Sequence, residues 1–328
     1  MPPEPPDGLF RPHPWLAGGH RQTLLGFWLR RRLLWPLPAE DLVVEAEPGV
    51  RLLLRASWQP GPRGRHPALV LVHGLGGSDA SAYVVSTGRL AFARGWHVVR
   101  MNMRGAGDGG ALCPRLYNAG LDTDLLAVLG ALSPLVERLA VVGFSLGANL
   151  ALLALGRRRE QLPAALVAAA AVSPPLDLAA CADTLGRPAN RLYQHYFLRK
   201  LVDAYRERQK SRPDLFEAGR ERGLRTVREY DDRITAPYGG YAGAAEYYAR
   251  SSAGPWLEAI DRPALVLTAQ DDPMIPVASV ACWPLPASGH VRREIVHTGG
   301  HVGFVSRAAA SGSFWAPERV LAFLEGGA

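Results

Sequence analysis

A Gly-x-Ser-x-Gly pentapeptide at residues 143–147 has the residue types and spacing of a nucleophilic site. An apolar run precedes it and a helix-forming segment follows, so Ser145 is expected on a sharp turn from strand to helix. The backbone of such a turn is strained, and the positions two before and two after the serine must be small, as Gly143 and Gly147 are. The pattern predicts that Ser145 is a nucleophile raised above the end of a strand.

A serine hydroxyl needs a base within hydrogen-bond reach and a third group that orients the base. Asp272 opens an Asp-Pro-x-x-Pro run directly after the apolar segment 264–269, and His301 lies in a glycine-rich loop after the last apolar segment. The chain order Ser, Asp, His is typical of one serine hydrolase fold. We therefore predict Asp272 as the orienting acid and His301 as the base.

Each of these two residues has a neighbouring rival. His297 stands at the end of its strand, where a packed side chain is expected, whereas the loop around His301 suits a catalytic imidazole. Asp271 directly precedes Asp272, and only the spacing to the two prolines favours Asp272.

The tetrahedral intermediate of acyl transfer also needs backbone donors for its oxyanion. The tight turn after the third apolar segment supplies one amide in this fold, and the residue after the nucleophile supplies the other. We assign these donors to the main chains of Leu75 and Leu146. Each such donor is worth about 3 kcal/mol of transition-state stabilisation.

Two further chemistries, nucleotide binding and metal binding, find no support in the sequence. Residues 105–110 match Gly-x-Gly-x-x-Gly, but Pro114 stands where a long helix should continue, and the preceding strand is not the first. No His-Glu-x-x-His occurs, and the nine histidines are scattered. We expect no cofactor, no metal and no nucleotide site.

The elements that would position these residues are short apolar segments alternating with helical ones, the signature of parallel βαβ units. Several segments are apolar throughout, which indicates a sheet covered by helices on both faces. The expected strands are 42–46, 52–58, 68–73, 96–101, 139–144, 165–172, 264–269 and 291–297.

The segment from about Pro174 to Pro255 lacks clear strands and carries aromatic residues at partly helical spacing. It lies between the sixth and seventh strands, from where it can cover the carboxyl edge of the sheet. We therefore expect an N-terminal arm at 1–40, and at 41–328 a single α/β domain with a helical cap inserted at about 174–255.

The composition fits a globular protein, with 48% hydrophobic and 20% charged residues. The net charge of +7 is scattered along the chain, so no nucleic-acid partner is expected. The densest basic run is Arg30 to Arg32, between Phe27-Trp28-Leu29 and Leu33-Leu34-Trp35. This stretch suits either peripheral contact with a membrane or packing of an N-terminal helix on the protein body.

The three cysteines stand far apart, which suggests reduced thiols. No signal peptide or transmembrane run is evident in the sequence, so a cytoplasmic location is expected. The oligomeric state is left open.

The chain resembles the YheT-like subfamily of α/β-hydrolases, bacterial proteins related to eukaryotic lipases, esterases and medium-chain acyltransferases. The markers of the resemblance are the segments 19–23, 104–105, 143–149, 228–236, 240–241, 247–248 and 299–304. The resemblance implies an eight-stranded α/β-hydrolase fold and places a triad on Ser145, Asp272 and His301. His20 and the pair Asp231-Asp232 have no evident chemistry, and we expect them to anchor the arm and the cap.

These observations predict a serine esterase or lipase acting on a small-molecule or lipid-like ester. Acyl transfer to an alcohol would use the same acyl-enzyme, and a catalytically inactive fold that acts as a binding protein is the alternative from another class. If the aromatic residues of the cap form an apolar roof, acyl chains of roughly four to ten carbons gain affinity over acetate at about 0.8 kcal/mol per buried methylene. If those residues instead fill the core of the cap, the pocket is small.

Overall fold

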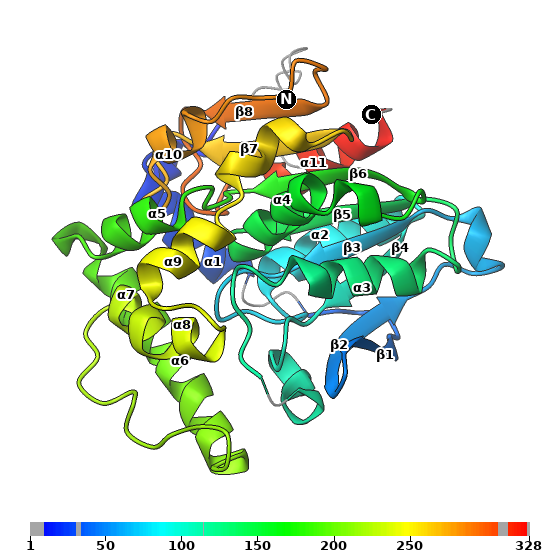
Figure 1. Ribbon diagram of the computed structural model, residues 1–328. Helices are drawn as coiled ribbons and strands as arrows, with labels where there is room; N and C mark the ends of the chain where they lie inside the picture. Colours follow the sequence, from blue (N-terminus) through cyan, green and yellow to red (C-terminus); the bar gives the residue numbers. More distant parts are fainter. Residues whose placement is uncertain (1–9, 31–33, 114, 308–313, 327–328) are drawn as a thin grey trace.

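The computed structural model describes residues 10–30, 34–113, 115–307 and 314–326. An eight-stranded sheet in the order β1-β2-β4-β3-β5-β6-β7-β8 crosses the molecule (Figure 1). Its strands are β1 (Glu40–Glu47), β2 (Val50–Ser57), β3 (Ala68–Val72), β4 (His97–Met101), β5 (Leu139–Phe144), β6 (Leu166–Val172), β7 (Ala264–Ala269) and β8 (Val291–Val296).

The predicted sheet is confirmed, with every expected strand present and its ends displaced by two residues at most. β2 runs antiparallel to both of its neighbours, β1 and β4. All other neighbouring strands, from β4 to β8 in the sheet order, are parallel. Every residue of β3, β4, β5 and β7 is buried, as predicted for apolar runs such as β3 and β5. In β4 the buried residues include His97 and Arg100.

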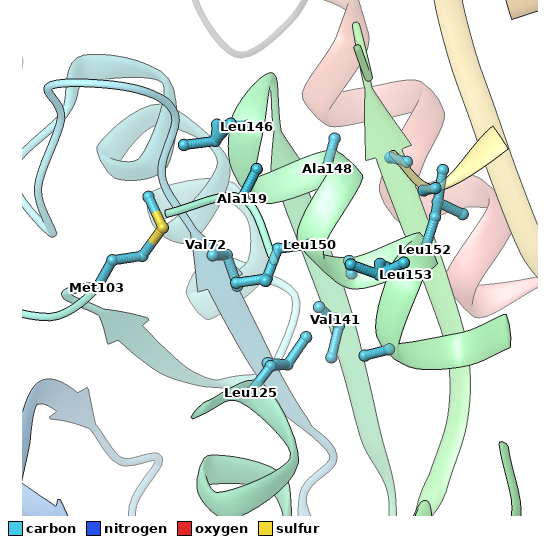
Figure 2. Packing of buried hydrophobic residues seen from close by; sticks show 14 of the residues in the cluster. Val72, Met103, Ala119, Leu125, Val141, Leu146, Ala148, Leu150, Leu152 and Leu153 are labelled. Carbon is cyan, nitrogen blue, oxygen red and sulfur yellow. The ribbon is translucent and has the colours of Figure 1, made fainter. Parts of the chain in front are cut away.

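Helices cover both faces of the sheet, so the sheet separates two hydrophobic cores, one on each face. One core joins the sheet to α3 (Asp122–Leu132) and α4 (Leu146–Arg157), and the other joins it to α2 (Ala82–Ala93) and α11 (Trp315–Glu325). Figure 2 shows the first core, in which the leucines of α4 pack against β3 and β5. Burying a leucine contributes about 1.5–3 kcal/mol, so this packing holds α4, and the turn before it, rigidly in place.

The segment between β6 and β7 is helical, as predicted, and no strand occurs between residues 174 and 255. Some of its aromatic side chains, those of Tyr205, Phe216 and Tyr238, pack on one another and fill its own core. Its helices are α5 (Leu178–Leu185), α6 (Arg191–Ser211), α7 (Val227–Tyr230), the π-helical turn η6 (Asp231–Thr235), α8 (Ala236–Tyr238) and α9 (Ala244–Ser251). The division into an arm at 1–40 and a domain with a cap stays a prediction.

The N-terminal region contributes α1 (Gly19–Arg30), which contacts α2. Within the basic and aromatic stretch, Phe27, Trp28 and Leu29 are exposed, whereas residues 31–33 lie outside the described part of the chain. The membrane contact considered for this stretch stays a prediction. Among the described helices, none has the length and apolar character needed to cross a bilayer.

The glycine-rich run after β4 forms only a short 3-10 helix, η3 (Gly107–Leu112). A dinucleotide site needs a long α-helix there, whose N-terminus binds the pyrophosphate. The rejection of a nucleotide site at residues 105–110 is consistent with this geometry.

Candidate active site

Ser145 occupies a strained turn between β5 and α4, with φ 51° and ψ −118°. A Cβ atom on Gly143 would lie 2.2 Å from the Gly147 carbonyl oxygen, and one on Gly147 would lie 2.5 Å from the His73 carbonyl oxygen. Neither position accepts a side chain without moving backbone. The small residues predicted around the serine are therefore a steric requirement of this turn.

The structure brings Ser145, His301 and Asp272 together from three separate segments. The Nε2 atom of His301 lies 2.9 Å from Ser145 Oγ, and its Nδ1 atom lies 2.9 Å from Asp272 Oδ2. The side chain of Asp272 is fully buried, and that of His301 is 9% exposed. When an imidazole lies between a hydroxyl and a buried carboxylate in this way, it can activate the hydroxyl as a nucleophile.

The second carboxylate oxygen of Asp272 is held by backbone donors. Its Oδ1 accepts the amides of Met274 at 2.9 Å and Ile275 at 3.0 Å, within the proline-containing turn. These two bonds leave only Oδ2 for the imidazole and set the direction of the carboxylate. The Asp-Pro-x-x-Pro spacing thus corresponds to a turn whose amides hold the Asp272 carboxylate in one orientation.

Neither rival residue contacts the serine. Asp271 Oδ1 accepts the amides of Gly299 and Gly300, both at 2.9 Å, and so holds the loop that carries His301. His297 Nδ1 lies 3.1 Å from the side-chain oxygen of Gln270 on an exposed part of the surface. Asp271 and His297 flank the constellation without joining it.

The turn after β3 leaves one backbone donor available near the serine. The amide of Gly74 donates to the Tyr83 hydroxyl at 2.9 Å, and that of Gly76 donates to the Tyr117 hydroxyl at 2.8 Å. Between them, the Leu75 amide has no acceptor in the described part of the chain, and the same holds for the Leu146 amide at the start of α4. The two predicted oxyanion donors are thus amides without protein acceptors.

His73 joins the turn after β3 to the segment after β4. Burial lowers the pKa of this imidazole to about 4, so it is neutral at pH 7. Its Nε2 accepts the Met103 amide at 3.1 Å, so Nδ1 carries the proton and donates to the Gly74 carbonyl at 2.8 Å. This pair of bonds fixes the backbone just before Leu75.

A cavity of about 290 Å³ adjoins the serine through Leu75 and Leu146. Its walls come from the turn after β3, the segments 105–107 and 116–118, α6, η6 and α9. A larger open groove of about 600 Å³ lies between α6 and residues 221–224. Ser145, Asp272 and His301 are among the lining residues of neither space, but the wall of the smaller cavity includes Leu146, the residue after the serine. Within the described residues, no group of three or more histidine, cysteine, aspartate or glutamate side chains could hold a metal ion.

Comparison with known proteins assigns the chain to a family. The family model described as the alpha/beta hydrolase fold matches residues 67–308. YheT of Escherichia coli (strain K12) is 32% identical over 307 residues, which cover 92% of this chain and 88% of that protein. The chain belongs to the α/β-hydrolase family. The resemblance to YheT-like hydrolases predicted from short motifs is confirmed along most of the chain.

Other members of the family are more distant from this hydrolase. Phospholipase ABHD3 of Mus musculus is 30% identical over 243 residues, which are 73% of this chain and 58% of that longer protein. The Monoacylglycerol lipase of Saccharomyces cerevisiae is 28% identical over 274 residues, 79% of this chain and 59% of the relative. The Pyrococcus furiosus esterase Pf2001 shares the fold, with a TM-score of 0.57 at 17% identity over 89% of this chain and 93% of the other.

The N-terminal helix of this hydrolase holds the histidine loop, a role that sequence patterns did not reveal. The Thr23 hydroxyl donates to the Gly19 carbonyl at 2.7 Å and accepts the His301 amide at 2.8 Å. The Gln22 side chain accepts the Val305 amide at 2.7 Å and donates to the Val305 carbonyl at 3.1 Å. Both polar side chains are buried, which a helical pattern alone does not predict.

Small residues allow this close approach of α1 to the loop. A Cβ atom on Gly19 would lie 1.7 Å from the Asp271 carbonyl oxygen, and one on Gly303 would lie 2.4 Å from the Gln22 carbonyl oxygen. His20 stacks on Tyr193 of α6, with ring centroids 5.7 Å apart, and Asp232 accepts the Ala244 amide at 2.9 Å. The anchoring roles expected of His20 and Asp232 agree with these contacts.

The Thr23 contact leads to a prediction about turnover. Thr23→Val keeps the shape of the side chain and removes the acceptor of the His301 amide, so the imidazole should lose its alignment with Ser145. We expect kcat to fall by about tenfold or more, because small displacements of a reacting group are costly, with a much smaller change in KM. Steady-state kinetics on a p-nitrophenyl ester measure both.

Two further variants control this experiment. Thr23→Ser keeps the hydroxyl and should restore most of the activity. Thr87→Val removes a buried threonine hydroxyl that has no hydrogen-bond partner in the described structure, so its kcat should stay near that of the wild type. Equal kcat values for Thr23→Val and the wild type would show that α1 does not position His301.

Proposed function

We propose that this hydrolase cleaves carboxylic esters through an acyl-enzyme on Ser145. The observation that carries the proposal is the unbroken line of hydrogen-bond distances from Ser145 Oγ through the His301 ring to Asp272. Two of the relatives are named for the hydrolysis of lipids, one as a phospholipase and one as a monoacylglycerol lipase, and these names support the proposal.

The proposed reaction begins with proton transfer from Ser145 Oγ to His301 Nε2 as Oγ attacks the ester carbonyl carbon. Asp272 Oδ2 accepts a hydrogen bond from His301 Nδ1, which leaves Nε2 free to act as a base and stabilises the imidazolium that forms. The amides of Leu75 and Leu146 then bind the oxyanion of the tetrahedral intermediate. Protonated His301 returns its proton to the leaving alcohol, and water hydrolyses the acyl-enzyme by the same route.

A fluorophosphonate probe tests this proposal directly, because it phosphonylates only a serine activated by a base. We expect the native protein to react at one site and mass spectrometry to locate the adduct on Ser145. Unlabelled but folded protein would favour the alternative of a hydrolase fold that only binds a ligand. Acyl transfer is separated from hydrolysis by adding an alcohol and measuring whether a new ester forms alongside the acid.

The cavity beside Leu75 and Leu146 leads to a prediction about acyl length. The side chains of Leu116 and Leu201 contribute further apolar wall to it. Each methylene that enters the cavity gains about 0.8 kcal/mol, and a volume of about 290 Å³ lies near the lower end of small-molecule sites. We therefore expect kcat/KM for p-nitrophenyl esters of roughly four to ten carbons to exceed that for the acetate.

A series of p-nitrophenyl esters of increasing acyl length measures this dependence. Because the volume of the cavity is limited to about 290 Å³, kcat/KM should stop rising once the acyl chain fills it. A steady decline from acetate onward would mean that the acyl chain does not enter the cavity.

A further inference from the structure

Asp231 lines the cavity beside the serine and takes no part in the hydrogen bonds of the triad. Its Oδ1 accepts the Thr235 hydroxyl at 2.6 Å, and its Oδ2 accepts the Tyr248 hydroxyl at 2.7 Å. The described residues provide no ion pair to this carboxylate, and burial raises its pKa to about 6. Arg228 is near enough to act on this carboxylate electrostatically, but it forms its ion pair with Asp183. A buried carboxyl group without an ion pair of its own is costly, so its presence at a cavity wall calls for a reason.

Three of the tyrosines that line the same cavity have hydroxyl groups with unused hydrogen-bonding capacity among the described residues. The Tyr117 hydroxyl accepts the Gly76 amide at 2.8 Å, and the Tyr247 hydroxyl accepts the Ala119 amide at 2.9 Å. Neither hydroxyl has an acceptor for its own proton in the described part of the chain. The Tyr230 hydroxyl has no hydrogen-bond partner at all among the described residues, although the residue is 2% exposed. The wall therefore offers several donors and, in Asp231, one buried carboxyl acceptor.

The backbone that presents Asp231 is unusual. Residues Asp231–Thr235 form the π-helical turn η6 between α7 and α8. Such turns are rare and occur frequently at functional sites, because the extra residue redirects neighbouring side chains. Here the turn and the residue before it place Tyr230, Asp231 and Thr235 on one cavity wall.

We propose that this cavity binds a hydroxyl-bearing part of the ester substrate, with Asp231 as acceptor and Tyr230 as donor. The proposal rests on the proposed ester hydrolysis and specifies the substrate class of that site. A hydroxyl group both donates and accepts, so it can use the two kinds of group in the wall at once.

Charged substrate groups fit the wall less well. A cation would be drawn to Asp231, but Lys200 lines the same cavity and would repel it, and the other carboxylate of the lining, Asp203, is exposed and lies 3.7 Å from Arg199. An anionic group would meet the Asp231 carboxylate. A purely apolar chain gains from the burial of its methylenes but gives Asp231 and the Tyr230 hydroxyl no further hydrogen bond, so a chain that carries a hydroxyl group at this wall gains more.

Two matched pairs of esters test the proposal and locate the hydroxyl. Methyl 6-hydroxyhexanoate and methyl heptanoate differ by a hydroxyl in place of a terminal methyl on the acyl side, and 4-hydroxybutyl butyrate and pentyl butyrate differ in the same way on the alcohol side. We expect the hydroxylated ester of one pair to have a kcat/KM about tenfold higher than its partner, as one or two net hydrogen bonds would provide. A ratio of one or below in both pairs overturns the proposal.

Two variants link any preference to this wall. Tyr230→Phe removes a hydroxyl that has no partner in the described structure, and Asp231→Asn replaces the charge while keeping the shape. Both should bring the ratio within the preferred pair close to one, and the ratio is unaffected by a general loss of activity. Tyr205→Phe is the control, because its hydroxyl bonds the Glu217 carbonyl and Tyr205 does not line the cavity. A preference that survives both Tyr230→Phe and Asp231→Asn contradicts the assignment.

Ligand binding separates this proposal from the proposed function. Saturation-transfer NMR on the full-length Ser145→Ala protein should show tighter binding of the hydroxylated ester of the preferred pair, and Tyr230→Phe should remove the difference. If the wild type hydrolyses none of the four esters, ester hydrolysis is contradicted while binding still tests the cavity. If all four are hydrolysed without preference, the cavity proposal fails and the hydrolase assignment stands.

Discussion

Ser145→Ala is expected to lower kcat by on the order of 10⁶ while the protein stays folded. The only hydrogen bond of Ser145 Oγ in the described structure is the one to His301 Nε2, so its removal takes away the nucleophile and no structural contact. Alanine keeps the Cβ atom, and the positive φ at this position therefore costs the same in both proteins. Turnover of a p-nitrophenyl ester and labelling by a fluorophosphonate should both be lost.

A check of folding and a control variant show whether the loss of activity is due to the missing nucleophile. Circular dichroism and thermal unfolding should give wild-type values for Ser145→Ala. Ser86→Ala is a matched control, because the Ser86 hydroxyl donates only to the nearby Tyr83 carbonyl. It should remain active and react with the probe. Esterase activity of Ser145→Ala near the wild-type level would remove Ser145 from the mechanism.

Asp272→Asn is expected to lower kcat by about 10⁴, the effect of the equivalent change in serine proteases. The amides of Met274 and Ile275 need an acceptor at the Oδ1 position, so the new side chain should place its oxygen there and its NH₂ group toward His301. That NH₂ group can only donate to Nδ1. It therefore favours the tautomer with the proton on Nε2, which cannot accept the proton of Ser145.

The neighbouring acid supplies the matched control. Asp271→Asn keeps an oxygen for the Gly299 and Gly300 amides, and Asp271 Oδ2 has no partner in the described structure. We expect its kcat to fall by less than about tenfold, since the alignment of the imidazole is retained. Steady-state kinetics of the two variants side by side decide between the acids, and a larger loss for Asp271→Asn would identify Asp271 as the functional acid.

The strands were predictable because their signals are local. Uninterrupted apolar runs such as Ala68–Val72 and Leu139–Phe144 have few stable solutions other than burial in a helix-covered parallel sheet. The ends of the strands were less accurate, since β1 and β2 continue into polar residues such as Glu40 and Arg51. An antiparallel pair exposed on one side tolerates polar residues, so its hydropathy pattern does not mark where pairing stops.

The candidate site was only partly predictable, because only some of its features depend on local sequence. The steric demands at Gly143 and Gly147 act within a few residues of Ser145, and the order of acid and base follows from the order of the strands. The helical spacing of the aromatic residues in the segment 174–255 did not show which of them would lie near the serine. Tyr205 and Phe216 fill the core between helices, whereas Tyr230 lines the cavity, and only the packing of the segment separates these fates.

By itself, the sequence determined the sheet, the turn that carries Ser145, and the chain order of the proposed acid and base, because backbone sterics and burial act over short stretches of chain. The tertiary structure decided which acid faces His301, and it brought Thr23 to the amide of a residue 278 positions away. It also brought the pair Tyr230 and Asp231 to a cavity that the turn after β3 lines as well. These contacts join segments whose separation in sequence carries no distance information, so they depend on how whole layers pack.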